Sequence, residues 1–369
     1  MLVLTGATGF FGSHFLAEHL LRHPRAQVVA LVRDSPTRVR ARVGAALLAT
    51  GRPLTARDLA RVKPVRIDLA DPQLGLDRRV YDTLARRTGV LCHFAGHIGL
   101  ETPLDVLRET NVLGTGHILR LAAASPRPIP VFHISTAYVA GGQTAGTVAE
   151  RVLEKPSGGF LTAYEESKHE AECLVADYAA AGTGRRCTIV RPSILVSDRL
   201  RRPGAPQHPL GVLGSQVAAL LRLSGAAGPR GLFSPDNPVT ARLTGSPTAS
   251  LNLVQVEHAA QALHRITAGG TAPGTEAEVV HLVHPRNVAV PVLLDALAQH
   301  LPGLDFVLSP RVESPTPLEM LLHRFGQGAH LYTHLHRDYA RHNYHRRVGR
   351  MPEPDPITPT YLRHAFSLS

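Results

Sequence analysis

A tyrosine and a lysine spaced four residues apart are the residues best suited to chemistry in this chain of 369 residues. Tyr164-Glu165-Glu166-Ser167-Lys168 opens a predicted helix, and one helical turn places Tyr164 and Lys168 on the same face. An ammonium group beside a phenol favours the phenolate and brings the tyrosine pKa from about 10 toward the neutral range. We therefore predict that the pair transfers protons, the alternative being an exposed turn with two unrelated polar residues.

Two adjacent hydroxyl groups end the strand that is expected before this helix. Ser135 and Thr136 close the apolar run that begins at Val131, and either side chain could hydrogen-bond a carbonyl oxygen. Asn111 lies inside an earlier predicted helix, where asparagine is a mediocre helix former and is more often a surface residue. From the residues alone, Asn111 is therefore expected to be structural.

A glycine-rich turn near the N-terminus predicts a dinucleotide site. Leu2 to Thr5 is a short apolar run, Gly6-Ala7-Thr8-Gly9-Phe10-Phe11-Gly12 follows it, and a helical pattern begins directly afterwards. Such a turn lets backbone N–H groups at the helix N-terminus approach a pyrophosphate with no Cβ in the way. We interpret the turn as cofactor-binding rather than as a plain loop.

The end of the second strand indicates which dinucleotide is bound. Leu31-Val32-Arg33-Asp34 presents an arginine before an acid, and arginine accommodates a 2′-phosphate whereas an acid binds the 2′-hydroxyl. NADPH is therefore favoured over NADH. Arg38 and Arg42 follow on a predicted helix, where they either contact phosphate or form a solvated basic face. Asp68, after the third strand, either accepts from the adenine amino group or caps a turn.

Alternating strands and helices in residues 1–197 must position these groups. The strands are nearly all apolar, which predicts a doubly wound parallel sheet, a Rossmann domain of the α/β class. We expect residues 198–369 to form a smaller, mostly helical substrate-binding region over the carboxyl edge of the sheet, with some strands returning to the Rossmann core. Strands are expected at 2–5, 28–32, 65–67, 90–94, 131–135, 188–190, 251–256 and 279–283, and helices at 39–48, 81–87, 104–124, 164–181, 212–223, 258–267, 292–300 and 318–344.

The composition argues against several classes of function. The formal net charge is +11, but 37 of the 40 basic residues are arginine and no five like charges adjoin, which indicates coding bias rather than nucleic-acid binding. The 3 cysteines lack CxxC spacing, so we predict neither a disulfide framework nor a zinc site. Cysteines without a disulfide framework fit a reducing compartment, so we predict a cytoplasmic location. No apolar stretch is long enough for a membrane span, and the N-terminus lacks a signal peptide.

Five histidines gather toward the C-terminus. They lack an HExxH or His-carboxylate pattern, and the chain has 21 histidines in all, so we expect a solvated or partly buried helix face and assign no metal. These histidines are His330, His334, His336, His342 and His345.

Taken in order along the chain, the motifs resemble those of the extended short-chain dehydrogenase/reductases. The shared features are the TGxxGxxG turn, Ala95-Gly96, Asn111, Ser135-Thr136, the YxxxK pair and Arg191-Pro192-Ser193, within roughly residues 2 to 300. Leu31-Val32-Arg33, Asp68-Leu69 and Asn111-Val112-Leu113-Gly114-Thr115 are similar to the branch of thioester reductases and fatty acyl reductases.

This resemblance implies an NADPH-dependent reductase of an acyl thioester, with an aldehyde as product or, after a second hydride, an alcohol. It assigns the catalytic roles to Thr136, Tyr164 and Lys168. The cofactor-binding residues that it implies are Thr5, Gly6, Thr8, Gly9, Phe10, Phe11, Gly12, Arg33, Arg42, Asp68, Leu69, Ala95, Gly96, Asn111, Tyr164, Lys168, Pro192 and Ser193.

The sequence departs from this branch in two respects. Phe94-Ala95-Gly96-His97 stands where the branch often has Asn-Ala-Ala, which alters the pocket wall near the nicotinamide. The first strand begins at residue 2, so we expect the acyl group to arrive on a separate acidic carrier protein or as a coenzyme A ester. The alternatives are a reductase of a free ketone or aldehyde, an enzyme acting on a nucleotide sugar, and a non-catalytic dinucleotide-binding regulator. The sequence predicts no oligomeric state.

Overall fold

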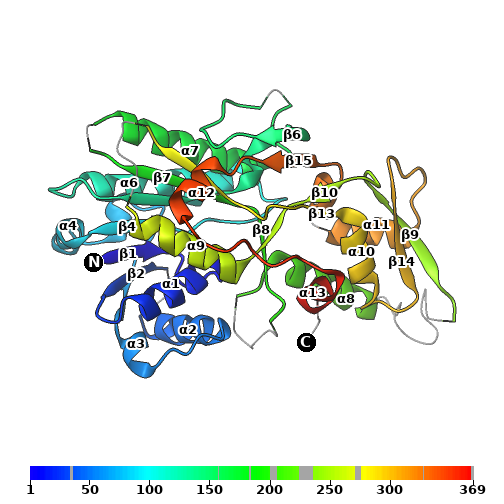
Figure 1. Cartoon of the computed structure of the whole chain (residues 1–369), viewed down its shortest axis with the longest axis horizontal. Coiled ribbons are helices and arrows are strands. Elements are labelled where there is room, and N and C mark those ends of the chain that lie inside the picture. Colours follow the sequence, from blue (N-terminus) through cyan, green and yellow to red (C-terminus); the bar gives the residue numbers. More distant parts are fainter. Residues whose placement is uncertain are drawn as a thin grey trace.

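A seven-stranded parallel sheet with helices on both faces forms one part of the molecule, and a smaller region adjoins it (Figure 1). The computed structural model describes residues 1–33, 36–156, 158–182, 184–199, 206–223, 236–270, 276–326 and 328–366. The strand order is β12-β7-β5-β4-β1-β2-β3, which confirms the doubly wound α/β sheet. The strands are β1 (Leu2–Thr5), β2 (Val28–Val32), β3 (Val62–Arg66), β4 (Val90–His93), β5 (Val131–Ile134), β7 (Cys187–Pro192) and β12 (Glu278–Leu282).

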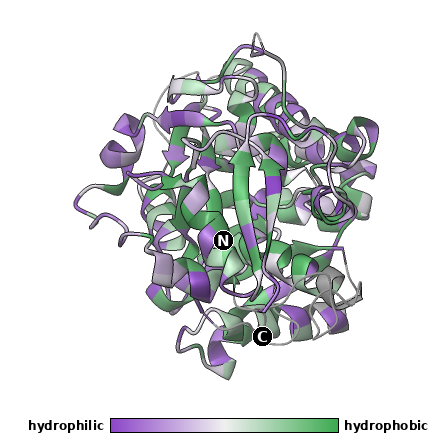
Figure 2. Ribbon diagram, turned by 90° about the vertical axis from the view of Figure 1, so that its right-hand side faces the viewer, coloured by the Kyte–Doolittle hydropathy of each residue, from purple (hydrophilic) through white to green (hydrophobic). Residues whose placement is uncertain are grey.

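Helices cover both faces of the sheet, because its strands are apolar on both sides. One hydrophobic core joins one face to α1, α2, α9 and α12, and a second joins the other face to α4, α6 and α7. In Figure 2 the strands are largely green, while purple is most frequent on peripheral helices and loops. The helices are α1 (Phe10–Arg22), α2 (Pro36–Ala49), α4 (Arg78–Arg87), α6 (Gly114–Ala123), α7 (Ala163–Ala180), α9 (Val256–Ala268) and α12 (His342–Val348).

The strand order reverses at β1, which lies between β4 and β2. Ligands of open α/β sheets bind in the crevice outside the carboxyl ends of the strands at such a point. The glycine turn follows β1, and Ser135 and Thr136 follow β5, so the groups expected to do chemistry share this edge.

Residues after 197 build a second core and also return to the sheet. The helices α8 (Pro209–Leu223), α10 (Val290–Ala298), α11 (Pro317–Phe325) and α13 (Pro359–Phe366) pack with the parallel strands β9 (Val239–Thr244) and β14 (Leu304–Ser309). By contrast, β12 extends the main sheet beyond β7, and α9 packs against α1 (Figure 1). The domain boundary at residue 197 therefore stays a prediction. In the structure, α9, β12 and α12 pack with the Rossmann part although they follow that boundary. Within the described ranges, every helix is too short or too polar to span a bilayer.

The long helix expected over residues 318–344 is wrong. The chain instead forms α11, a 3₁₀ turn at Ala329–Tyr332, the strand β15 (His336–Tyr339) and α12. Gly328 adopts a φ of 81°, which ends the helical path, and β15 pairs with β6 (Ala145–Val148). The expected strand at 251–256 is likewise divided, because α9 already begins at Val256. The remaining short elements are α3 (Ala56–Ala60), α5 (Leu104–Arg108), β8 (Ile194–Val196), β10 (Ser250–Leu251), β11 (Leu253–Gln255) and β13 (Val288–Ala289).

A buried ion pair joins α7 to β7. Arg191 Nε donates to Glu172 Oε1 at 2.9 Å and Arg191 Nη2 donates to Glu172 Oε2 at 2.6 Å, and both side chains are 0% exposed. Two parallel hydrogen bonds between a guanidinium and a carboxylate fix distance and orientation together. The pair therefore sets the position of α7 on the sheet.

We predict that Glu172→Gln lowers the free energy of unfolding by about 3–5 kcal/mol, because it leaves the Arg191 charge buried without its counter-charge. Urea unfolding of both proteins measures the loss. The matched control is Asp82→Asn, which breaks an exposed pair with Arg78 at 3.0 Å and should cost about 0.5 kcal/mol or less. Equal losses in the two variants would contradict a structural role for the buried pair.

Candidate active site

The glycine turn packs so closely on its neighbours that Gly6 and Gly12 have no space for a Cβ. Gly6 adopts a φ of 71°, and a Cβ there would lie 2.8 Å from Phe94 Cβ. A Cβ on Gly12 would lie 2.2 Å from the Gly6 carbonyl oxygen, so α1 packs closely on the turn. Gly9 precedes α1 without a capping side chain, which leaves the first N–H groups of the helix for a bound anion. These features fit a dinucleotide pyrophosphate.

A chain of buried hydrogen bonds joins β1, β4 and the helix that carries Asn111. Ala95 N donates to Thr5 Oγ1 at 2.9 Å, and Thr5 Oγ1 lies 2.7 Å from His93 Nδ1. On the other side of the ring, His93 Nε2 lies 3.2 Å from Thr115 Oγ1, which donates to the Asn111 carbonyl at 2.6 Å. Burial lowers the pKa of His93 from 6.5 to about 3, so the ring is neutral and holds both hydroxyls.

Asn111 is not a surface residue, contrary to the usual preference of asparagine in a helix. It is 1% exposed and lies in a π-helical turn at Glu109–Leu113. Its Oδ1 accepts from His97 N at 2.7 Å, and its Nδ2 donates to Ser167 Oγ at 2.9 Å. Asn111 thus ties the loop after β4, with Ala95 and Gly96, to the first turns of α7.

Tyr164 and Lys168 lie on the first two turns of α7, beside the carboxyl end of β5. Lys168 Nζ donates to the Ile134 carbonyl at 2.8 Å and lies 3.4 Å from His133 Nε2. Burial lowers the pKa of Lys168 from 10.5 to about 8. Burial, with the nearby Glu165 carboxylate, raises the pKa of Tyr164, whereas the sequence predicted a lower one. A protonated phenol at neutral pH is the form that a proton donor requires.

Three hydroxyl groups lie at neighbouring strand ends. Thr136 Oγ1 accepts from Tyr138 N at 3.2 Å, while the Ser135 and Ser193 hydroxyls are buried with no hydrogen-bond partner. Ser135 and Ser193 follow β5 and β7, which are adjacent, and Ser193 follows Pro192 directly. Buried hydroxyls are normally hydrogen-bonded, so these two are suited to contact a bound ligand.

The residues proposed for the adenosine half lie beside β2 and β3. Arg33 and Arg42 are both exposed, whereas Asp34 lies outside the described residues. Asp68 Oδ1 accepts from Ala70 N at 2.9 Å and so caps its turn, and the Leu69 carbonyl lies 2.8 Å from His117 Nδ1. The turn-capping alternative for Asp68 is therefore observed.

Sequence reasoning missed a cluster from the C-terminal region. Arg337 is 2% exposed, lies 5.0 Å from the centre of the Tyr138 ring and donates to the Gly141 carbonyl at 2.9 Å. The Tyr138 and Tyr332 rings pack edge to face at 4.9 Å. Leu161 and Leu251 pack against this cluster, so it lies beside the start of α7. No local motif signals it, because β15 brings these residues to β6 from far along the chain.

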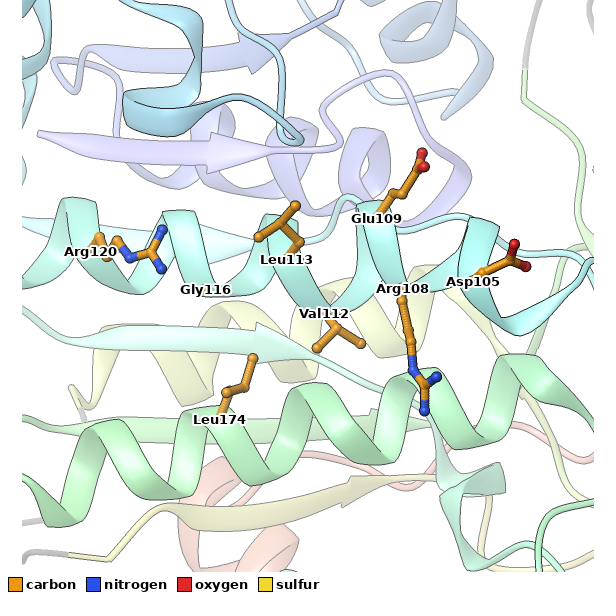
Figure 3. Close-up of a pocket in the computed structure, with 8 residues that line it drawn as sticks. All are labelled: Asp105, Arg108, Glu109, Val112, Leu113, Gly116, Arg120 and Leu174. Atoms are coloured by element: carbon orange, nitrogen blue, oxygen red, sulfur yellow. The ribbon is translucent and has the colours of Figure 1, made fainter.

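A groove of about 440 Å³ is lined by residues of α5, α6 and α7 and of the π-helical turn between α5 and α6. Figure 3 shows Arg108 extending from α5 toward α7, where its Nε donates to Glu170 at 2.8 Å. The groove contains none of the residues predicted to be catalytic. It is lined by Asp105, Arg108, Glu109, Val112, Leu113, Gly116, Arg120 and Leu174.

Comparison with known families settles the class of protein. The family model described as "Male sterility protein" matches residues 4–263. The chain belongs to this family. It is therefore an NAD(P)-dependent oxidoreductase of the extended short-chain dehydrogenase/reductase type, as the motifs predicted.

Relatives of this family member are much longer proteins. The present chain is 35% identical over 182 residues to the isonitrile lipopeptide synthase of Streptomyces coeruleorubidus, and the match covers 49% of this chain and 12% of that protein. It is 29% identical over 325 residues to the L-2-aminoadipate reductase large subunit of Penicillium chrysogenum, and the match covers 82% of this chain and 21% of that protein. The chain thus spans about a fifth or less of the length of these relatives.

Solved structures confirm the fold of the family member. The terminal R domain from the myxalamid PKS-NRPS biosynthetic pathway superposes with a TM-score of 0.74 at 21% identity, over 100% of this chain and 89% of that one. The dTDP-glucose 4,6-dehydratase DesIV from Streptomyces venezuelae gives a TM-score of 0.63 at 20% identity, over 99% and 95%.

The lowered pKa of Lys168 predicts a pH dependence. The side chain is an ammonium below about pH 8 and a neutral amine above it, so kcat/KM for reduction should fall above about pH 8 if the charge assists Tyr164. A pH–rate profile of kcat/KM measures this alkaline decrease. The control is Lys63→Arg, at an exposed lysine, which should leave the alkaline decrease unchanged. A profile flat to pH 10 would show that the ammonium is not required.

Proposed function

We propose that the protein reduces an acyl thioester to an aldehyde with NADPH. The observation that carries the proposal is the placement of Tyr164 and Lys168 at the start of α7, on the sheet edge that also holds the glycine turn. A likeness to a reductase subunit and to the terminal R domain of a PKS-NRPS pathway supports the thioester as substrate. An intact set of Thr136, Tyr164 and Lys168 argues against a non-catalytic regulator.

The chain's own residues bind and polarise the carbonyl group. The Thr136 hydroxyl and the protonated Tyr164 hydroxyl hold the carbonyl oxygen, with Ser135 beside them. The glycine turn would hold a reduced nicotinamide dinucleotide, which would supply the hydride for the carbonyl carbon. Tyr164 gives its proton to the oxygen, which forms a hemithioacetal. When the carbon–sulfur bond then breaks, the hydroxyl group returns its proton to Tyr164, the sulfur takes a proton from solvent, and the products are an aldehyde and a free thiol.

The donor of the acyl group is proposed from charge. With a net charge of +11, the chain would attract an acidic carrier protein or the phosphates of coenzyme A. Both donors present the same thioester to the site, so one assay can compare them. The proposed setting is secondary-metabolite or lipid biosynthesis in the cytoplasm.

We predict that Tyr164→Phe lowers kcat for thioester-dependent NADPH oxidation by about 10²–10⁴-fold, because the variant lacks the proton donor. Absorbance of NADPH, with product analysis by mass spectrometry, measures the loss. Tyr178→Phe, on the same helix but away from the strand ends, is the matched control and should retain full activity.

The substrate panel for this assay separates the proposal from its alternatives. It contains carrier-bound thioesters, coenzyme A thioesters, free aldehydes and ketones, and nucleotide sugars. Turnover of free carbonyls or nucleotide sugars alone would overturn the thioester assignment while leaving the role of Tyr164 intact. Wild-type protein without NADPH oxidation on any of these substrates would contradict the enzymatic assignment.

The NADPH assignment rests on Arg33, which is exposed at the carboxyl end of β2. Loss of a hydrogen bond to a charged group costs about 1.5–3 kcal/mol, so Arg33→Ala should weaken NADPH binding roughly 10- to 100-fold. NADH binding should stay within twofold, because NADH lacks the 2′-phosphate. Fluorescence titration measures both affinities, with Arg79→Ala in α4 as the control. Equal weakening for both dinucleotides would contradict a 2′-phosphate contact.

A further inference from the structure

Three histidines meet where the C-terminal end of α1 packs against α9. His19 lies in the last turn of α1, His23 caps that helix, and His264 lies in α9. Figure 1 shows these two helices side by side. One ring nitrogen of each lies within 4.8 Å of the others. Within the described ranges, this is the only set of three histidine, cysteine or acidic side chains so arranged, and the C-terminal histidines form none.

The three ring nitrogens lie close enough together to share one ion. His23 Nε2 and His264 Nε2 lie 3.0 Å apart. Ligand atoms about 2.0–2.1 Å from a tetrahedral ion lie about 3.3–3.4 Å from one another, close to that separation. His19 Nε2 is buried and has no hydrogen-bond partner, although it belongs to the same group. A buried ring nitrogen without a hydrogen-bond partner is available to coordinate a metal ion.

We propose that His19, His23 and His264 bind one divalent transition-metal ion of the zinc class, with water as the fourth ligand. Imidazole nitrogen is a preferred ligand of zinc, copper and nickel, whereas calcium and magnesium take oxygen ligands. No carboxylate belongs to the cluster, so the described residues favour the first group. His23 is exposed, so an ion can enter from solvent.

Two of the arginines around the cluster are paired with carboxylates, while Arg265 and the N-terminal amino group also act on its histidines. Arg22 pairs with Glu18, and Arg61 Nη2 lies 2.6 Å from Asp58 Oδ1. Arg61 also donates to the His23 carbonyl at 2.7 Å and to the Leu20 carbonyl at 2.7 Å. These bonds hold the end of α1, and therefore both of its histidines, in place before an ion binds.

The site is distinct from the chemistry proposed above. The 13 residues of α1 extend about 20 Å, and the glycine turn lies at the other end of this helix. The ion would instead join α1 to α9, whose ligands His23 and His264 are 241 positions apart in the chain. We therefore assign the ion a structural role, in which binding to the folded state stabilises it.

The test uses the full chain without an affinity tag, after treatment with a chelator. Co²⁺ titration should give the intense visible absorption of tetrahedral cobalt with one equivalent bound, and Zn²⁺ should raise Tm. His23→Gln, at an exposed side chain, should weaken binding at least about tenfold and remove the Tm shift. His334→Gln makes the same exchange at an exposed histidine outside the cluster and should retain both signals.

Two results would overturn the proposal. One is the absence of tetrahedral cobalt absorption in the wild-type protein. The other is equal Zn²⁺ affinity in the wild-type and His23→Gln proteins, which would place the ion elsewhere. Because the readouts are absorption, affinity and Tm, the outcome does not depend on whether the thioester assignment holds.

Discussion

The buried pair between Glu172 and Arg191 constrains the whole candidate active site, because it fixes one face of α7 on the sheet. Tyr164, Lys168 and Glu172 recur at every fourth residue of α7 and therefore lie along one face. Glu172 holds that face to β7, while Lys168 binds the carbonyl at the end of β5. A helix attached only by apolar contacts could slide or rotate. With these polar attachments, the Tyr164 hydroxyl is held at a defined height above the strand ends.

Buried polar groups also connect the proposed cofactor half of the site to the proposed catalytic half. The bonds from Thr5 through His93 and Thr115 end at Asn111, and Asn111 binds Ser167 on α7. Each member is taken out of water, so a missing member would leave its neighbours unsatisfied at a cost of about 1–3 kcal/mol. The network therefore favours a single arrangement of β1, β4 and α7, which is what pre-organised catalysis requires.

The sequence predicted features that depend on near neighbours and missed those that depend on distant ones. Apolar strands and the four-residue spacing of Tyr164 and Lys168 are local features of the sequence. The sheet and the pair on α7 could therefore be predicted from it. Asn111 is buried within a π-helical turn, and residue propensities predict neither its burial nor the turn. Arg337 reaches its buried place through the pairing of β15 with β6, segments about 190 residues apart, and a helical pattern concealed that strand. The raised pKa of Tyr164 depends on three-dimensional burial, which spacing does not encode.

The last strand of the sheet, β12, comes from beyond the first part of the proposed substrate region. That region is thus interrupted by elements of the Rossmann core rather than appended to its end. Removing everything after β7 would expose a long apolar strand edge, which is a template for aggregation. Exchanging substrate regions between relatives would consequently need several junctions in the chain, placed around α9, β12 and α12. Recombining such proteins would therefore require several internal segments to be replaced together, and exchanging one C-terminal segment would not suffice.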